Sequence, residues 1–275
     1  MIKKRYWFLF GLTLIAFIFL SILGKNYVNK VSNQQKALVR SQMEPSIFVP
    51  GSSATKERFN DMLSALNSVH RKYSILKVVV SKTDKLIYSG NITSNDNHPF
   101  IVIAFENNQD GYDNIKKQAK WLSLAMTDLQ KQYHFKRFNA IGHSNGGLNW
   151  TLFLEKYYSS ENFHIEKLIT IGTPYNFEES NPSNRTQMLK DLIDDHEAIP
   201  SSLLVYNLAG TDSYEDDKIV PFASVETGKF IFQKVVKHYT QVTVTGIDAS
   251  HSDLPSNPEV IQYVAEKILS VGRPK

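Results

Sequence analysis

A serine flanked by glycines constrains the fold of this chain more than any other feature. Residues 142–146, GHSNG, match the pattern G-x-S-x-G with Ser144 at the centre. An apolar stretch precedes this pattern, and helix-compatible residues follow it from Leu148. We therefore predict a strand, a tight turn and a helix, because larger side chains two residues before or after the serine would clash with neighbouring backbone. Ser144 would stand at the helix N-terminus, where free N–H groups favour developing negative charge.

From residue 45 onward, short apolar runs alternate with longer amphipathic segments, which is typical of an α/β fold. Strands are predicted at Ile47–Val49, Leu76–Ser81, Lys85–Tyr88, Phe100–Phe105, Phe138–Ile141, Lys167–Ile171, Leu203–Leu208 and Val235–Val244. Helices are predicted at about residues 55–71, 112–133, 146–158 and 258–270. We expect a hairpin around residues 81–85 and, overall, a mostly parallel central sheet flanked by helices.

One long connection, between Thr173 and Ser202, interrupts this alternation. Within it, Met188, Leu189 and Leu192 belong to a short apolar stripe, which predicts a helix. Connections of this length are often functional, so we expect a small helical cap over the site at about residues 175–200. The alternative is a surface segment that does not contact any ligand.

The N-terminus predicts a membrane anchor. Three cations at residues 3–5 precede residues 6–24, which carry no charge. A run of roughly 20 apolar residues matches the hydrocarbon thickness of a bilayer, and the preceding cations favour a cytoplasmic N-terminus. We expect a signal-anchor at residues 1–24, a juxtamembrane stalk at 25–44 and an extracytoplasmic domain. A cleaved signal peptide, giving a secreted protein, is the alternative, although no A-x-A-like site stands out.

Composition excludes several classes of function. The chain has no cysteine, so it can use neither a thiol nucleophile nor a disulfide. The net charge of +4 is spread over the sequence without a basic stripe, so nucleic acid is not an expected partner. The eight histidines lack metal-ligand spacings, so no catalytic metal is expected.

A nucleophilic serine needs a general base, and in this kind of arrangement the acid and then the histidine follow the serine in the chain. Only His238 and His251 lie beyond the late strand predicted at residues 203–208. His238 falls inside a predicted strand. His251 lies in a polar loop between the last strand and the last helix, so we assign it as the base. His143, beside the serine, is expected to pack locally.

The acid must follow a late strand and orient the histidine. The loop after residues 203–208 contains Asp212, Asp216 and Asp217. Asp217 is favoured because it directly precedes the apolar-proline step KIVP, while Asp212 is the main alternative acid. For the oxyanion, the expected donors are the backbone N–H groups of Asn145 and Ser52, with Ser53 as an alternative to Ser52.

With these residues in place, the chain resembles the α/β-hydrolase superfamily, and more narrowly the predicted cell-surface α/β-hydrolases of unknown function from Gram-positive bacteria. The resemblance rests on PSIFVPGSSAT, PFIVIAFENNQ, FNAIGHSNGGL, LITIGTPYNF, DKIVPFAS and SHSDLPSNPEV. It implies an α/β-hydrolase domain at residues 45–275, with Ser144, Asp217 and His251 as the triad and no cofactor. One departure is the oxyanion turn, where the family usually has His-Gly followed by more glycine and this chain has PGSSA at residues 50–54.

We therefore expect a membrane-anchored, extracytoplasmic serine hydrolase that acts on a small-molecule or lipid-like ester through an acyl-enzyme on Ser144. A non-catalytic cell-surface module that binds a ligand on the same fold is one alternative, supported by the altered oxyanion turn. An acyltransferase with the same triad is another, since it differs from a hydrolase only in how water reaches the acyl-enzyme.

Overall fold

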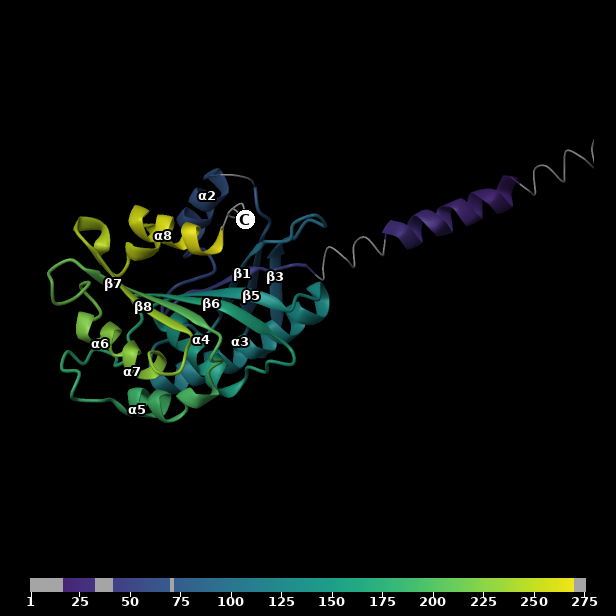
Figure 1. The fold of residues 1–275 in the computed structure, drawn as a ribbon. Helices are drawn as coiled ribbons and strands as arrows, with labels where there is room; N and C mark the ends of the chain where they lie inside the picture. Colours follow the sequence, from purple (N-terminus) through teal and green to yellow (C-terminus); the bar gives the residue numbers. More distant parts are fainter. Residues whose placement is uncertain (1–16, 33–41, 70–71, 270–275) are drawn as a thin grey trace, which may run out of the picture.

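A computed structural model describes residues 17–32, 42–69 and 72–269. Within these residues the centre of the fold is an eight-stranded sheet with the order β3-β2-β4-β1-β5-β6-β7-β8 (Figure 1). Its strands are β1 (Ser46–Val49), β2 (Ile75–Val80), β3 (Leu86–Gly90), β4 (Phe100–Phe105), β5 (Arg137–His143), β6 (His164–Ile171), β7 (Leu204–Thr211) and β8 (His238–Thr245). Among these described strands, every neighbouring pair is parallel except the β2–β3 hairpin.

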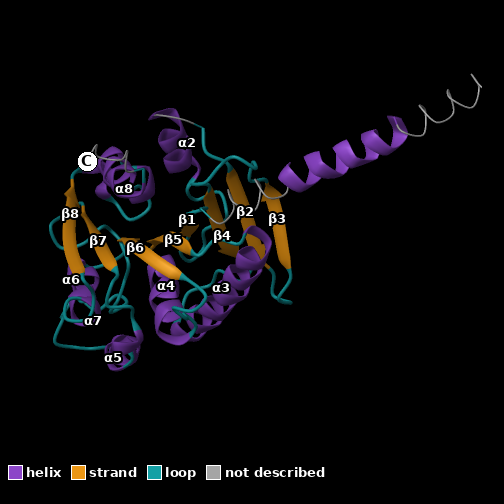
Figure 2. Cartoon of the chain, turned by 45° about the vertical axis from the view of Figure 1, so that its right-hand side comes forward, coloured by secondary structure: helices purple, strands orange, loops and turns teal. Residues whose placement is uncertain are grey.

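Helices cover both faces of the sheet (Figure 2). They are α2 (Asn60–Val69), α3 (Tyr112–Tyr133), α4 (Asn145–Lys156), α5 (Gln187–Asp194), α6 (Phe222–Glu226), α7 (Gly228–Phe232) and α8 (Pro258–Ile268). On one face, α2 and α8 bury residues such as Met62 and Val260 against the sheet. On the other face, α3, α4, α5 and α7 share a larger apolar core that includes Trp150 and Phe232. This three-layer arrangement is the predicted α/β fold.

The predicted strands all form, with ends shifted by about three residues at most. β8 begins at His238 rather than Val235 because the chain first completes a turn, in which the N–H groups of Val235 and Val236 donate to Phe232 O at 3.0 Å. Helix α2 begins at Asn60, later than predicted. Helices α6 and α7 have five residues each, too few for a helical period to stand out in the sequence.

The predicted cap forms a helix, but this helix does not lie over the cavity. Helix α5 forms, and its apolar residues Met188, Leu189 and Leu192 are buried in the same core as Trp150 of α4. It lies beside α4 and α7, at the bottom of Figure 1. The apolar stripe therefore joins α5 to the body of the domain. Only the start of the connection, at residues 174–178, lines the cavity described below.

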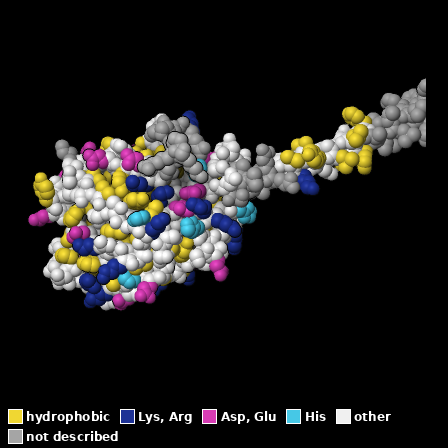
Figure 3. All heavy atoms as spheres, viewed as in Figure 1, with side chains coloured by type: hydrophobic (Ala, Val, Ile, Leu, Met, Phe, Trp, Pro, Cys, Tyr) yellow, Lys and Arg dark blue, Asp and Glu magenta, His cyan; other side chains and the backbone are white. Residues whose placement is uncertain are grey.

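The predicted anchor and stalk are described only in part. Residues 17–32 form one helix, outside the globular body, with exposed apolar side chains such as Phe17 and Leu20 (Figure 3). Residues 1–16 of the predicted anchor and 33–41 of the predicted stalk lie outside the described residues. Among the described helices, none is both long and apolar enough to cross a membrane.

Glu155 on α4 is an ionisable group inside the core. It is 8% exposed, and neither buried carboxylate oxygen has a hydrogen-bond partner among the described residues. Burial, followed by the nearby charge of Asp195, raises the pKa of Glu155 from 4.5 to about 9. Between these two values the folded chain keeps a proton that the unfolded chain has released. Unfolding therefore becomes easier as the pH rises, by up to about 1.4 kcal/mol per pH unit.

Glu155→Gln should remove this pH dependence, because glutamine has a similar shape and does not ionise. We expect the variant to be more stable than the wild type at pH 8, with a difference that shrinks toward pH 5. Urea unfolding from pH 5 to pH 8 measures it. Glu161→Gln, at an exposed glutamate, is the matched control. A stability difference that stays constant across this range would contradict the buried neutral Glu155.

Candidate active site

Ser144 occupies a strained turn between β5 and α4. Its backbone has φ 54° and ψ −130°, a conformation that a residue with a Cβ rarely adopts. The turn is held by its N–H, which donates to Ile171 O on the neighbouring strand at 2.8 Å. Strain of this kind costs about 1–3 kcal/mol and is concentrated at functional sites. The turn lifts the Ser144 side chain above the carboxyl end of the sheet, as a nucleophile elbow does.

The two glycines of the pattern allow close backbone approaches. A Cβ on Gly146 would lie 2.0 Å from Val49 O of β1, and a Cβ on Gly142 would lie 2.5 Å from the N atom of Gly147. Neither backbone neighbour can move aside without distorting the sheet or α4. The steric reason for predicting a tight turn from G-x-S-x-G therefore holds in this structure.

His251 and Asp217 form a buried pair in the loops after β8 and β7. The distance from His251 Nδ1 to Asp217 Oδ2 is 2.7 Å, and the two residues are 6% and 0% exposed. Asp217 Oδ1 accepts the N–H groups of Ile219 at 3.1 Å and Val220 at 2.7 Å. The backbone of His251 also donates to Asp217 O at 2.7 Å. These hydrogen bonds hold the Asp217 side chain in a fixed orientation against the imidazole.

The rival acids have other partners. Asp212 is exposed and forms an ion pair with Lys218 at 3.2 Å. Asp216 Oδ1 accepts the N–H of Lys218 at 2.9 Å. No described contact joins either carboxylate to His251. His238 is the first residue of β8, so it lies at the other end of that strand from the His251 loop.

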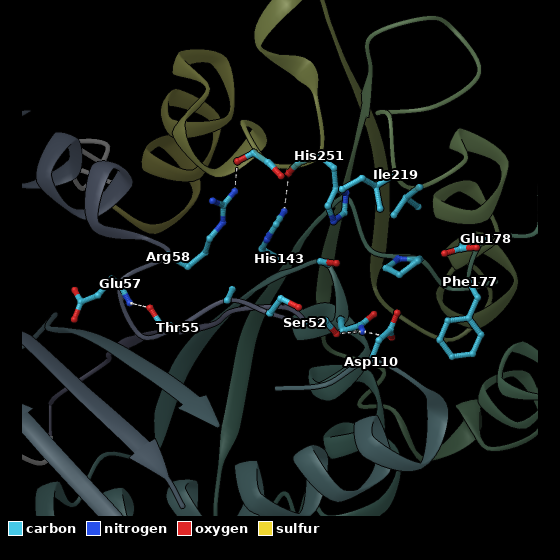
Figure 4. Close-up of a pocket in the computed structure, with 17 residues that line it drawn as sticks. Ser52, Thr55, Glu57, Arg58, Asp110, His143, Phe177, Glu178, Ile219 and His251 are labelled. Atoms are coloured by element: carbon cyan, nitrogen blue, oxygen red, sulfur yellow. Dashed lines mark hydrogen bonds between the residues drawn. The ribbon is translucent and has the colours of Figure 1, made fainter. Parts of the chain in front are cut away.

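One cavity of about 590 Å³ brings the predicted residues together. Ser144, His251, Ser52 and Asn145 all line it, while Asp217 is buried behind His251. Figure 4 shows His251 and His143 above its centre, Arg58 toward one end and Phe177 toward the other. The volume is within the usual range for small-molecule sites.

The oxyanion turn places backbone N–H groups beside Ser144. A Cβ on Gly51 would lie 2.5 Å from Ser144 Cβ, so the turn runs directly against the serine. The N–H of Ser53 already donates to Asn108 O at 2.9 Å. The hydrogen bonds of the described residues include none from the N–H of Ser52 or of Asn145. These two N–H groups are therefore free to donate to a ligand.

Asp110, which the sequence analysis did not single out, ties this part of the site together. The side-chain amide of Asn145 donates both to Ser52 Oγ at 2.5 Å and to Asp110 Oδ1 at 2.7 Å. Asp110 lies in the loop after β4 and also accepts the N–H of Gly111 at 2.7 Å. The bridge fixes Ser52 relative to Asn145, so the two N–H groups keep a constant separation. A loop aspartate carries no motif that would reveal this contact in advance.

His143 was expected to pack locally, but it lines the cavity and packs against His251. Its Nε2 donates to His251 O at 2.9 Å, and the ring centroids are 4.9 Å apart. Burial, followed by repulsion from the charges of His251 and Arg58, holds the pKa of His143 well below 6.5, so the ring is neutral. His143 and Asp217 thus hold the backbone of His251 at its O and N atoms respectively.

Comparison with known proteins agrees with this geometry. The sequence matches the family described as alpha/beta hydrolase of unknown function (DUF915) over residues 33–271. The chain belongs to this family. Its sheet, with helices on both faces, is an α/β-hydrolase fold. No sequence among curated proteins matches the chain.

Several solved structures are similar. A protein of Lactobacillus plantarum WCFS1, provisionally described as a cell surface hydrolase, is 47% identical with a TM-score of 0.78, covering 85% of this chain and 94% of its own. The product of the lin2722 gene of Listeria innocua is 27% identical with a TM-score of 0.76, covering 85% and 96%. A thermostable carboxyl esterase from Bacillus coagulans shares the fold at 13% identity and a TM-score of 0.52, covering 84% and 89%.

Proposed function

We propose that the protein is a membrane-anchored serine hydrolase of the cell surface that cleaves a carboxylic ester through an acyl-enzyme on Ser144. The observation that carries this proposal is the pairing, in one cavity, of a strained Ser144 with a His251 whose Nδ1 is held by Asp217. Backbone strain of this kind is concentrated at functional sites, and a nucleophile elbow requires it.

The mechanism that we propose gives each group a role. Asp217 accepts the Nδ1–H of His251, which leaves Nε2 without a proton in the neutral imidazole. His251 then takes the proton of Ser144 as Oγ attacks the ester carbonyl. The N–H groups of Ser52 and Asn145 stabilise the oxyanion, and His251 returns the proton to the leaving alcohol. Water, activated by the same histidine, hydrolyses the acyl-enzyme without a cofactor.

The extracytoplasmic location rests on the N-terminal sequence. Residues 6–24 are uncharged and follow three cations, which favours a single-pass anchor with a cytoplasmic N-terminus. The described part of this segment, from Phe17, is helical and exposes its apolar side chains. The similar protein from L. plantarum is also described as a cell surface protein. The globular domain would then face the cell exterior.

A membrane-impermeant fluorophosphonate probe tests chemistry and location together. Applied to intact cells that produce the full chain, it should label Ser144, and the labelled protein should sediment with the membranes. The purified full chain in detergent should also react and should hydrolyse p-nitrophenyl esters. Folded protein that neither reacts nor hydrolyses esters would point to a non-catalytic binding module instead. Labelling of purified protein but not of intact cells would contradict the location alone.

A further inference from the structure

We propose that Arg58 binds an anionic group of the substrate, so that the preferred esters carry a carboxylate or a phosphate in addition to the scissile bond. This inference rests on the proposed ester hydrolysis at Ser144 and names the class of substrate. Arg58 lies just before α2, in the segment that follows β1, and lines the same cavity as Ser144 and His251 (Figure 4).

The guanidinium group of Arg58 is not fully satisfied. One nitrogen, Nη2, donates to Ser252 O, beside His251. The Nε atom is buried and has no hydrogen-bond acceptor among the described residues. An arginine offers five N–H donors in a planar fork, and buried donors in native proteins nearly always have partners. The hydrogen bonds of the described residues include none from Nη1 either, so the Nη1 edge of the fork remains available to an acceptor on a ligand in the cavity.

The nearby carboxylates each have another hydrogen-bond or ion-pair partner. Asp61 Oδ2 accepts Ser256 Oγ at 3.1 Å, and Asp253 accepts Ser250 Oγ. Glu57, which also lines the cavity, forms an ion pair with Lys77. Among the described residues, no ion pair includes Arg58. The charges of Asp253 and Asp61 only partly offset the burial that lowers the pKa of Arg58.

The two ends of the cavity differ in chemistry. Thr55 lines the same cavity, and its Oγ1 accepts the N–H of Glu57 at 3.2 Å. Toward the other end, Phe177 and Ile219 supply apolar surface beside the carboxylate of Glu178. A ligand that spans Ser144 would thus place oxygen atoms at Arg58 and a hydrocarbon group at Phe177. Arginine binds carboxylate and phosphate groups with two parallel hydrogen bonds, which fits the anionic end.

Matched ester pairs test this preference. In the first pair the acyl group is charged or neutral, as in 4-nitrophenyl monoadipate and methyl 4-nitrophenyl adipate. In the second pair the alcohol group is charged or neutral, as in 4-carboxyphenyl butyrate and the methyl ester of its carboxyl group. The wild type should favour the anionic member of at least one pair, and the pair that responds shows which side of the ester faces Arg58. Arg58→Met should lower kcat/KM for that anionic ester about 10- to 100-fold, mainly through KM.

The neutral esters provide the internal control. Arg58→Met should lower the kcat/KM of the neutral esters by a clearly smaller factor than that of the anionic ester, and Arg58→Lys should keep part of the anion preference, since it retains the charge without the fork. Lys116→Met, at an exposed cation on α3, controls for net charge. The same loss on anionic and neutral esters would overturn the proposal and leave Arg58 as a structural tether of the Ser252 loop. An equal wild-type rate within both pairs would also overturn it.

Binding without turnover separates this proposal from the proposed function. Calorimetric titration of the Ser144→Ala protein with monomethyl adipate should show binding that Arg58→Met weakens, whether or not the wild type is an esterase. Dimethyl adipate should bind with no dependence on Arg58. If the wild type hydrolyses neutral esters but Arg58→Met leaves the binding of monomethyl adipate unchanged, the proposed function stands and the role of Arg58 is wrong.

Discussion

Ser144→Gly is expected to abolish ester hydrolysis and, at the same time, to raise the free energy of unfolding by about 1 kcal/mol. The loss of activity, about 10⁴-fold or more in kcat, follows from removing the nucleophile. The gain in stability follows from the backbone at φ 54° and ψ −130°, which strains any residue with a Cβ and suits glycine. Esterase assays and urea unfolding measure the two effects.

Ser144→Ala separates the two contributions. It should lose activity to the same extent but keep nearly the wild-type stability, because alanine has the same backbone strain as serine. A serine that serves only as a turn residue predicts the opposite pattern, with hydrolysis unaffected by either change. Equal stability of the glycine and alanine variants would contradict the strain argument while leaving the nucleophile assignment intact.

Asp217→Asn is expected to lower kcat by about 10³- to 10⁴-fold. The N–H groups of Ile219 and Val220 would hold the amide oxygen where Oδ1 now lies, so the NH₂ group would face His251 Nδ1. Nδ1 would then have to accept, which moves the imidazole proton to Nε2 and prevents His251 from acting as a base. KM should change little, because Asp217 is buried behind His251. Steady-state kinetics on a neutral p-nitrophenyl ester measure the effect.

Asp212→Asn is the matched control, with the same chemical change in the same loop. Its carboxylate is paired with exposed Lys218 and has no described contact with His251, so kcat should stay within about 2-fold of the wild type. A large loss of kcat in Asp212→Asn, with little loss in Asp217→Asn, would reverse the assignment of the acid. Folding of both variants can be checked by near-UV circular dichroism, since the core contains Trp150 and Trp121.

The fold was largely predictable from the sequence, because its signals are local. Buried parallel strands appear as apolar runs, and the i, i+3, i+4 pattern of α3 marks a helix packed on the sheet. The short helices α6 and α7 carry no such period. The apolar stripe of α5 revealed a helix but not its packing partner, so a cap over the site was the wrong expectation. An apolar stripe shows that a helix buries one face. Only the tertiary structure shows which elements that face packs against.

The sequence by itself determined the strand, turn and helix around Ser144 and the late loop that carries His251, since both depend on short-range sterics and on chain order. Only the tertiary structure decided which aspartate meets His251, because Asp212 and Asp217 share one loop and its turn directs their side chains apart. The tertiary structure also decided that Arg58 reaches the cavity of Ser144. These contacts join loops that follow different β-strands and are distant in the chain. Such loops meet at one edge of the sheet only because parallel strands lie side by side in it.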